Sequence, residues 1–145
     1  MGHILFWLCW PLLWMYTPLT RRVRVLIRVG DEFLAVKNWF GPGVWQLPGG
    51  GVKFGESIVQ AGIREIEEEL SVAIALDSVQ VLSQDIVVTK QFGLLMRYQY
   101  IAVSLANKPD VETSKEVASY SWLSTKDSYN AAEINTALDF VAKQR

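Results

Sequence analysis

The sequence predicts a layered domain of the mixed α/β class with a short apolar helical extension in front of it. Three observations predict this. Strand-like stretches surround one central helical segment, an amphipathic helical segment closes the chain, and an apolar run occupies the beginning. The chain has 145 residues, half of them hydrophobic, which suits one domain with a substantial core. We expect residues 1–20 to form the extension and residues 21–145 the folded domain, with Thr17-Pro18 at the boundary.

The overall composition excludes several kinds of chemistry. The formal net charge is −1, so no global field favours a nucleic-acid partner. A single cysteine, Cys9, excludes an internal disulfide and a cysteine-based zinc cluster, and it fits a reducing, cytoplasmic compartment. The only histidine, His3, lies near the terminus. Catalysis would therefore depend on carboxylates, lysines, tyrosines or a bound metal.

The apolar run Ile4–Tyr16 is too short to cross a bilayer. It has 13 residues, whereas a spanning helix needs roughly 20, and Pro11 would interrupt it. It is also a poor secretory signal, because no basic residue precedes it and no small-x-small site follows. If it is one helix, the spacing predicts that three tryptophans share a face: Trp7, Trp10 and Trp14.

A helix that is apolar on all sides must be buried in something. One alternative is packing on its own domain or on a partner subunit, which leaves a homodimer open. Another is peripheral membrane contact through Ile4–Tyr16, with nearby basic residues facing anionic lipid: Arg21, Arg22 and Arg24. A signal or anchor segment is the third alternative. Membrane association therefore stays open beside a cytoplasmic location.

The first half of the domain predicts two strands followed by a loop. Arg22–Val29 alternates polar and β-branched residues, and Phe33–Val36 is apolar. Gly30-Asp31-Glu32 supplies the turn between them. Lys37–Val44 is expected to be a loop because it contains Gly-Pro-Gly, and the glycine-rich stretch Trp45–Ser57 continues without a long periodic pattern.

The second half begins with the central helix. Ser57–Leu70 has helical periodicity, with one apolar stripe made of Val59, Gly62, Ile63, Ile66 and Leu70. Glycine in mid-helix costs about 1 kcal/mol relative to alanine, so Gly62 predicts close packing on a sheet. The remaining elements are expected in this order: strand Val79–Thr89, turn Gln91-Phe92-Gly93, strand Leu94–Leu105, loop Ala106–Ser114, strand Val117–Leu123 and helix Ala131–Lys143.

Acidic side chains gather on one face of the central helix. Glu65, Glu68 and Glu69 are spaced i, i+3 and i+4, while Glu67 points to another side. Like charges at this spacing repel one another, so either the face is simply solvated or a cation lies among them. Oxygen-rich clusters suit hard cations such as Mg²⁺ or Mn²⁺. The backbone carbonyls of Gly49–Gly51 can add ligands, because glycine has no side chain to block approach.

The spacing from Gly50 to Val72 resembles the Nudix box, G-x5-E-x7-R-E-U-x-E-E-x-G-U, in which U is a bulky aliphatic residue. Eight of its nine specified positions match. The preceding W-Q-L-P-G-G, Trp45–Gly50, is similar to the usual lead-in of this superfamily. Ser71 replaces the box glycine at the expected helix end, where a left-handed backbone is common, so we expect a cost of about 1 kcal/mol there. The resemblance implies a Nudix-type α/β/α sandwich with a mixed sheet from about Arg21 onward.

The resemblance also implies a function: hydrolysis of pyrophosphate bonds in nucleoside diphosphate-X or nucleoside triphosphate substrates by water attack at phosphorus, with Mg²⁺ or Mn²⁺. By the resemblance, the metal ligands are the Gly50 carbonyl, Glu65, Glu68 and Glu69. Arg64 is expected to orient Glu65, and Glu56 to support the same network.

The general base stays open between two kinds of residue. It is either Glu65 or a carboxylate outside the box, as in several relatives. Glu116 is the candidate outside the box, because the segment that follows it is similar to the E-x4-5-W segment near the end of many Nudix domains. Glu112 is a weaker candidate.

Two other functions are weighed against the hydrolase. A non-catalytic, nucleotide-sensing Nudix domain usually lacks box carboxylates, whereas this chain keeps them all. A membrane-docked Nudix hydrolase shares the chemistry and adds Ile4–Tyr16 as an anchor. Four aromatic residues are candidates for stacking on a base, although core or surface packing is their commoner role: Trp39, Phe40, Tyr98 and Tyr100.

Overall fold

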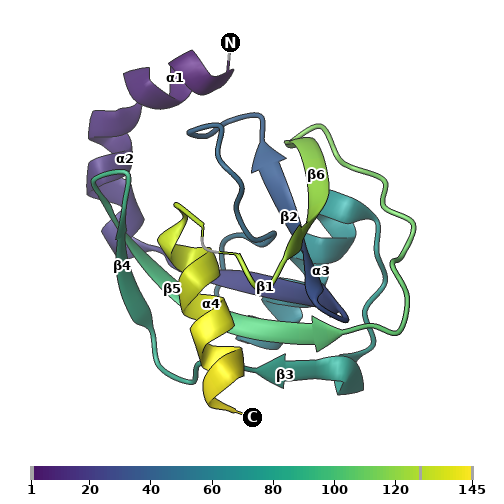
Figure 1. The fold of residues 1–145 in the computed structure, drawn as a ribbon. Coiled ribbons are helices and arrows are strands. Elements are labelled where there is room, and N and C mark those ends of the chain that lie inside the picture. The colour runs from purple at the N-terminus through teal and green to yellow at the C-terminus, as the bar shows by residue number, and fades with distance from the viewer. Residues whose placement is uncertain (1, 128, 145) are drawn as a thin grey trace.

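The computed structural model describes residues 2–127 and 129–144, without the side chain of His3, so the histidine prediction lies outside the described side chains. Figure 1 shows a sheet with helices around it and two short helices at the N-terminus. The helices are α1 (Gly2–Leu8), α2 (Trp10–Tyr16), η1 (Thr17–Leu19), α3 (Ile58–Leu70), η2 (Leu76–Ser78) and α4 (Ala132–Lys143). The strands are β1 (Arg21–Val29), β2 (Glu32–Asn38), β3 (Val79–Val81), β4 (Val87–Gln91), β5 (Leu94–Ser104) and β6 (Val117–Ser124).

The sheet is mixed, as expected. Its strand order is β3-β5-β1-β2-β6, and β4 also pairs with β5. β1 and β5 are parallel, from Arg21 opposite Arg97 to Arg28 opposite Ser104, while the other strand pairs are antiparallel. β1 and β2 pair only beside their turn, at Arg28–Phe33 and Val29–Glu32. The two strands therefore separate further along and leave room for another segment between them.

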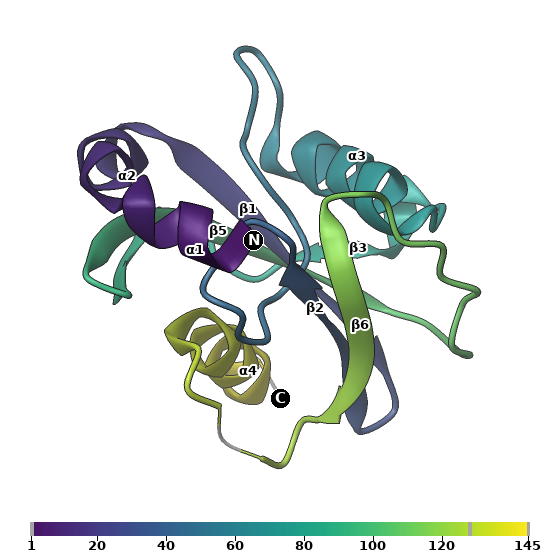
Figure 2. The ribbon, with the colours of Figure 1, turned by 90° about the horizontal axis from the view of Figure 1, so that it is seen from above.

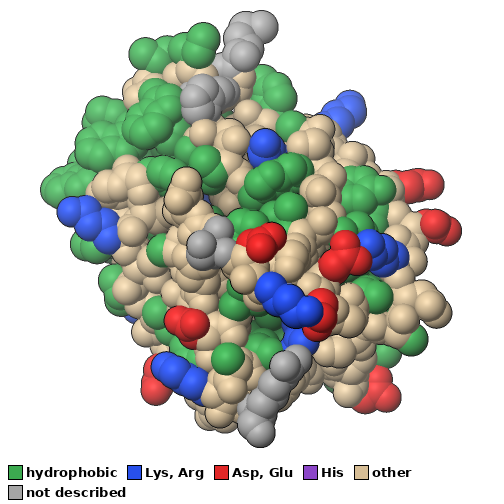
Figure 3. Space-filling model, viewed as in Figure 1, with side chains coloured by type: hydrophobic (Ala, Val, Ile, Leu, Met, Phe, Trp, Pro, Cys, Tyr) green, Lys and Arg blue, Asp and Glu red, His purple; other side chains and the backbone are tan. Residues whose placement is uncertain are grey.

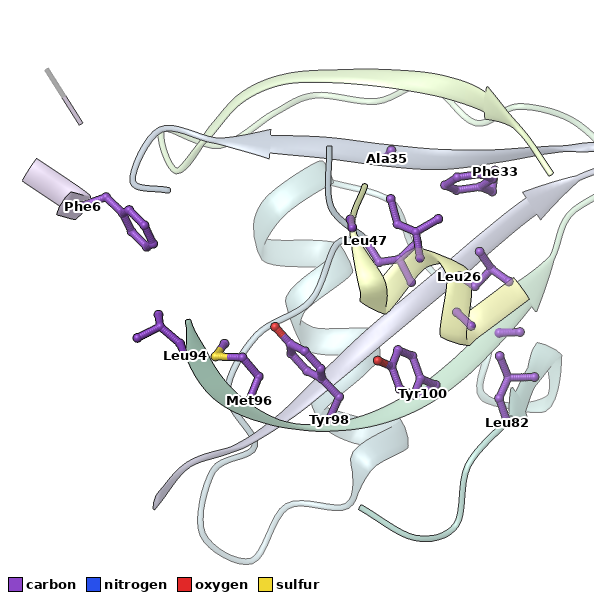
Figure 4. Packing of buried hydrophobic residues seen from close by; sticks show 14 residues of the cluster. Phe6, Leu26, Phe33, Ala35, Leu47, Leu82, Leu94, Met96, Tyr98 and Tyr100 are labelled. Atoms are coloured by element: carbon purple, nitrogen blue, oxygen red, sulfur yellow. The ribbon is translucent and has the colours of Figure 1, made fainter. Parts of the chain in front are cut away.

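The two long helices cover opposite faces of the sheet, which gives the α/β/α sandwich (Figure 2). On the α3 face, a core cluster includes Val23, Val25, Ile66 and Ile101. On the α4 face, a second cluster includes Leu26, Phe33, Tyr100 and Ile134; Figure 4 shows most of this cluster between α4 and the strands. Burial of apolar surface on both faces is the main favourable contribution to folding.

Gly62 lies where α3 packs on the sheet. A Cβ atom at this position would collide with Ile101 and crowd Val25, so the expectation of close packing is confirmed. The apolar stripe is turned slightly from the expected one. Ala61 is fully buried on this face, whereas Ile63 is only half-buried, because the two small residues bring this side of the helix closest to the sheet.

The single strand expected at Val79–Thr89 is wrong. The structure has two shorter strands there, β3 and β4, which pair with different parts of β5. Between them, the amides of Leu82 and Ser83 both donate to the Tyr100 carbonyl, so two residues face one and the ladder breaks. The apolar pattern predicted extended backbone correctly but did not show this interruption.

The N-terminal segment forms two helices instead of one. Cys9 separates α1 from α2, and Pro11 occupies the first turn of α2, where proline is tolerated. The expectation that Trp7, Trp10 and Trp14 share a face is therefore wrong. Trp10 turns inward and its Nε1–H donates to the Phe92 carbonyl, whereas the other two are about half exposed. In the described part of the chain, no helix has the length and apolar character that crossing a bilayer requires.

Candidate active site

Helix α3 begins and ends where the local sequence predicts. The Ser57 hydroxyl accepts from the Gln60 amide, and the Gln60 side chain accepts from the Ser57 amide, which completes a capping box. At the other end, Ser71 adopts the left-handed conformation with φ of 55°. Its amide donates to the Glu67 carbonyl at 3.0 Å. The serine therefore occupies the backbone conformation in which the box glycine is least strained.

We expect replacement of Ser71 by glycine to stabilise the protein by up to about 1 kcal/mol, because a left-handed backbone costs an L-residue about that much. Greater freedom of the unfolded chain offsets part of this gain. Ser71→Asn should gain less, since asparagine tolerates the conformation moderately, and Ser71→Ala should gain nothing. Urea unfolding measures the order of the variants. A glycine variant less stable than the parent would contradict the expectation.

The glycine-rich segment fills the space between β1 and β2. The Val25 amide donates to the Pro48 carbonyl and the Val23 amide donates to the Gly50 carbonyl, both at 2.9 Å. The Val52 amide donates in turn to the Arg21 carbonyl at 3.0 Å. These bonds fix the loop against the sheet and hold it beside α3. The Gly50 carbonyl, predicted as a metal ligand, already accepts one hydrogen bond and keeps a second lone pair.

Two glycines allow the loop to approach the carboxylates of α3. A Cβ atom on Gly50 would lie 2.5 Å from the carboxylate of Glu65, so a larger residue there would displace it. Gly49 has a φ of 130°, and its amide donates to Glu69 Oε2 at 3.0 Å. The predicted proximity of this loop to the acidic face is therefore confirmed.

Arg64 connects the loop to the acidic side chains. Its Nε donates to Glu56 Oε1 at 2.8 Å, and its Nη1 donates to Glu65 Oε1 at 2.7 Å and to Glu68 Oε2 at 3.2 Å. Its Nη2 donates to the Gly51 carbonyl at 3.0 Å. Hydrogen bonds from Arg64 lower the pKa of Glu56 to about 2. One guanidinium thus holds three carboxylates in fixed orientations.

Glu69 is the most buried of the three clustered carboxylates, with 6% of its surface exposed. Its pKa is raised to about 7, mainly by burial and further by the nearby charges of Glu65 and Glu116. The hydrogen bond from the Gly49 amide and the charge of Arg24 lower this pKa but do not offset the effect of burial. By contrast, Glu68 is 56% exposed, and Glu67 is exposed on another side as expected. The cluster therefore extends from a buried carboxylate at the sheet to an exposed one at the surface.

The loop before β6 closes the acidic face from the other side. The Glu112 amide donates to the Leu70 carbonyl at 3.1 Å, and the Ser114 amide donates to the Glu69 carbonyl at 2.9 Å, so the loop is held on the end of α3. Helix α3 and this loop together form a hollow with about 470 Å³ of empty space, open solvent included. Its lining residues are Glu65, Glu68, Glu69, Ser114, Lys115 and Glu116.

The structure thus brings Glu116 to the predicted carboxylates across the fold, while Glu112 does not line the hollow. Sequence reasoning missed Lys115 and Ser114. The only signal for them was their position beside Glu116. Lys115 adds a positive charge to the lining of an otherwise acidic hollow.

The donor chemistry of the hollow fits a hard divalent cation, although the side chains are not gathered around one point. In the described residues, no three acidic, histidine or cysteine side chains are placed to hold a metal ion as they stand. Glu65 and Glu68 each turn one oxygen to Arg64, and Glu69 turns one to Gly49. Each carboxylate keeps a second oxygen, and carboxylate and carbonyl oxygens are the ligands that Mg²⁺ and Mn²⁺ prefer.

A buried ion pair behind the loop was not predicted, and the expectation that Arg24 faces anionic lipid is wrong, because its side chain is buried in this pair. Arg24 Nε donates to Glu133 Oε2 at 3.0 Å, and the two side chains are 3% and 0% exposed. Arg24 Nη1 also donates to the Gly49 carbonyl at 2.8 Å, and the Leu47 amide donates to Glu133 Oε1 at 2.9 Å. Helix α4 is therefore linked to the segment that carries Gly50. In the sequence, Glu133 was indistinguishable from the exposed charges of an amphipathic helix.

A second pocket lies on the α4 side of the sheet, with about 590 Å³ of empty space including open solvent. Its wall is partly aromatic, from Phe40 and Tyr98, and partly polar, from Arg22, Gln46 and Gln91. The N-terminal segment adds the following residues to it: Phe6, Leu13 and Thr17. Among the described residues, three that line this pocket each have a buried polar atom without a hydrogen-bond partner: Thr17 Oγ1, Arg22 Nε and Asn38 Oδ1.

Of the four aromatic residues named as stacking candidates, only two line this pocket, Phe40 and Tyr98. Tyr100 is fully buried in the core cluster, and Trp39 is about half exposed outside the pocket lining. The α4 face of the sheet thus offers a partly apolar chamber with unsatisfied polar atoms, separate from the acidic hollow.

A family model of the NUDIX domain matches residues 18–142, which is most of the chain. The chain belongs to the Nudix hydrolase superfamily. Enzymes of this superfamily generally use divalent metals such as Mg²⁺ or Mn²⁺ and act on small nucleotide substrates.

The relatives agree with this membership. Nucleoside triphosphatase NudI of Escherichia coli O81 (strain ED1a) is 34% identical over 93 residues, which cover 59% of this chain and 65% of that protein. The Ap4A hydrolase of C. elegans superimposes with a TM-score of 0.69 at 24% identity, covering 86% of this chain and 96% of that one. The MutT protein of Methanosarcina mazei Go1 gives 0.69 at 22% identity, with coverages of 87% and 95%. The two structural matches show the fold alone.

Proposed function

We propose that this Nudix domain hydrolyses a pyrophosphate bond in a nucleoside triphosphate or in a nucleoside diphosphate linked to a second moiety. The observation that carries the proposal is the hollow in which Glu65, Glu68, Glu69 and Glu116 gather beside the Gly50 backbone. Such a concentration of carboxylates repels an anionic substrate unless cations neutralise it, which supports a metal-dependent reaction. The nucleoside triphosphatase named among the relatives supports the substrate class.

In this proposal, Mg²⁺ or Mn²⁺ is held by the Gly50 carbonyl, Glu65, Glu68 and Glu69. A divalent ion there supplies charge neutralisation for the phosphate oxygens and acidifies a bound water. Arg64 orients Glu65 through the 2.7 Å bond, and Glu56 fixes Arg64 from the opposite side. Arg64 fixes one oxygen of Glu65 and one of Glu68, so the ion would take their second oxygens. These carboxylates would turn toward the ion when it binds, because no three acidic side chains among the described residues are placed to hold one as they stand.

Glu116 is the proposed general base. It would accept a proton from the attacking water as the new P–O bond forms and the bridging P–O bond breaks. Glu65 is less suited, because one of its oxygens is already bound to Arg64. In the described part of the chain, no hydrogen bond to the Glu116 carboxylate is found, and the residue is exposed at the hollow. Its carboxylate is therefore available for proton transfer.

The nucleoside part of the substrate is proposed to occupy the pocket on the α4 side. Phe40, which lines this pocket and is 39% exposed, offers aromatic surface for a base, whereas the Tyr98 ring is buried and already lies under the Arg24 guanidinium. The Gly49 peptide separates this pocket from the hollow: its amide faces Glu69 and its carbonyl faces Arg24. A nucleotide combines an aromatic base, which suits this pocket, with phosphate groups, which suit a metal-loaded acidic hollow.

The proposal is tested by phosphate release from a panel of nucleoside triphosphates and nucleoside diphosphate derivatives, with and without Mg²⁺ or Mn²⁺. Pyrophosphatase is added in one arm, and in another alkaline phosphatase, which detects the monophosphate product of a diphosphate derivative. We expect turnover of at least one class only when a divalent ion is present. Nucleotide binding by calorimetry without any turnover would instead support a nucleotide-sensing domain and contradict the hydrolase.

We expect Glu116→Gln to lower kcat by about 10²–10⁴-fold, the usual contribution of general acid–base catalysis. Binding of Mn²⁺, followed by paramagnetic relaxation of water, should remain because Glu116 is not among the proposed ligands. Glu112→Gln is the matched control in the same loop and should retain activity. An unchanged kcat in Glu116→Gln would assign the role to Glu65.

A further inference from the structure

The outward sides of α1, α2 and η1 form a hydrophobic surface. Seven of its residues are more than half exposed: Ile4, Leu8, Leu12, Trp14, Met15, Tyr16 and Leu19. Figure 3 shows hydrophobic side chains gathered over α1 and α2, with no acidic side chain among them on this face. Exposed apolar patches of this kind mark contact with a partner or a membrane.

The same helices are fixed to the domain by their inward sides. Phe6 is buried and packs edge-to-face on Phe40, with ring centroids 5.8 Å apart. Trp10 donates to the Phe92 carbonyl at 3.0 Å, and Thr17 is buried. These contacts fix the orientation of α1 and α2, so their outward residues stay exposed to solvent.

A strip of basic residues borders this surface. Arg21 of β1 lies opposite Arg97 of β5. Lys90 of β4 lies opposite Leu95, which is two residues from Arg97 on β5. Because alternate residues of a strand point to the same side, the three basic residues share one face of the sheet. Arg97 Nη1 donates to the Pro18 carbonyl at 3.4 Å, so the strip adjoins η1. Like charges opposite each other destabilise a sheet. In the described part of the chain, none of the ion pairs includes these three residues.

We propose that this surface docks on an anionic lipid membrane, with α1 and α2 lying in the interface. Apolar side chains with tryptophan and tyrosine, next to basic residues, match the boundary between acyl chains and anionic headgroups. No acidic residue precedes Asp31, so nothing at this end of the chain opposes such a surface. A second copy of the chain is the poorer occupant, because its matching surface carries the same basic strip and no acidic residue before Asp31 that could pair with this one. Neither helix is long enough to cross the bilayer.

Flotation of the full chain with phosphatidylcholine vesicles, with or without phosphatidylglycerol, tests the proposal. We expect binding to the anionic vesicles and weaker binding at high salt. The variant Arg21→Gln/Lys90→Gln/Arg97→Gln should reduce the partition coefficient on anionic vesicles about a hundredfold, at roughly fivefold per charge. Leu8→Ser/Leu12→Ser should reduce it on both kinds of vesicle, because both leucines are exposed and support only the contact.

The matched control is Leu76→Ser/Lys143→Gln, which removes an equally exposed leucine and a lysine away from this surface and should bind as the parent does. Thermal unfolding checks that every variant is folded. Absent binding to anionic vesicles, or binding that neither variant weakens, would overturn the proposal. So would a lipid-free dimer, detected by sedimentation, that Leu8→Ser/Leu12→Ser abolishes, since a second copy would then cover the surface. The flotation experiment measures membrane binding alone, so its result does not depend on whether the proposed hydrolysis occurs.

Discussion

Replacement of Glu68 by glutamine is expected to lower kcat by about 10²-fold or more under the proposed function. The change removes one negative ligand of a divalent ion, which contributes several kcal/mol of transition-state stabilisation. The fold should be unaffected, because Glu68 is 56% exposed and its ion pair with Arg64 is a 3.2 Å contact at the surface. Steady-state kinetics across a range of Mg²⁺ concentrations measures both kcat and the metal requirement.

Glu67→Gln is the matched control for this variant. Glu67 is the neighbouring residue on the same helix and is also exposed, but it does not line the hollow. It should retain the parent's kcat, which separates loss of a ligand from a change in the overall charge of α3. Parent-like turnover in Glu68→Gln at all Mg²⁺ concentrations would contradict the metal assignment, whatever the control shows.

Replacement of Glu133 by alanine is expected to destabilise the protein by about 3–5 kcal/mol. The variant leaves Arg24 buried without its counter-charge and leaves the Leu47 amide without an acceptor, and a buried charge that loses its partner is strongly unfavourable. Urea unfolding measures the loss. Because Arg24 also holds the Gly49 carbonyl, hydrolysis should fall in the folded variant as well.

The surface pair Glu32–Lys108 provides the comparison. Its Nζ–Oε2 distance is 2.7 Å, close to that of the buried pair, but both side chains are nearly half exposed. Glu32→Ala should cost less than about 1 kcal/mol, since solvent screens an exposed ion pair. Equal losses in Glu133→Ala and Glu32→Ala would show that burial of the Arg24–Glu133 pair is not what makes it important.

Local sequence determined the central part of the site. The capping pair Ser57 and Gln60 starts α3, and the left-handed residue Ser71 ends it, so the phase of the helix is set by neighbours in the chain. That phase places Glu65, Glu68 and Glu69 together, because the helical period alone fixes which side chains share a face. Gly50 could be assigned to the same site because the box spacing links it to these residues.

Only the tertiary structure decided the parts that depend on contacts between distant segments. Glu116 and Lys115 reach the hollow because their loop binds the carbonyls at the end of α3. Arg24 and Glu133 meet across the fold behind the glycine loop. The sequence likewise did not predict which side of α1 and α2 is buried against the domain. The segment is apolar on every side, so its pattern does not distinguish a buried side from an exposed one. Local pattern encodes period, turns and caps, whereas burial and pairing between distant residues arise only when the chain packs.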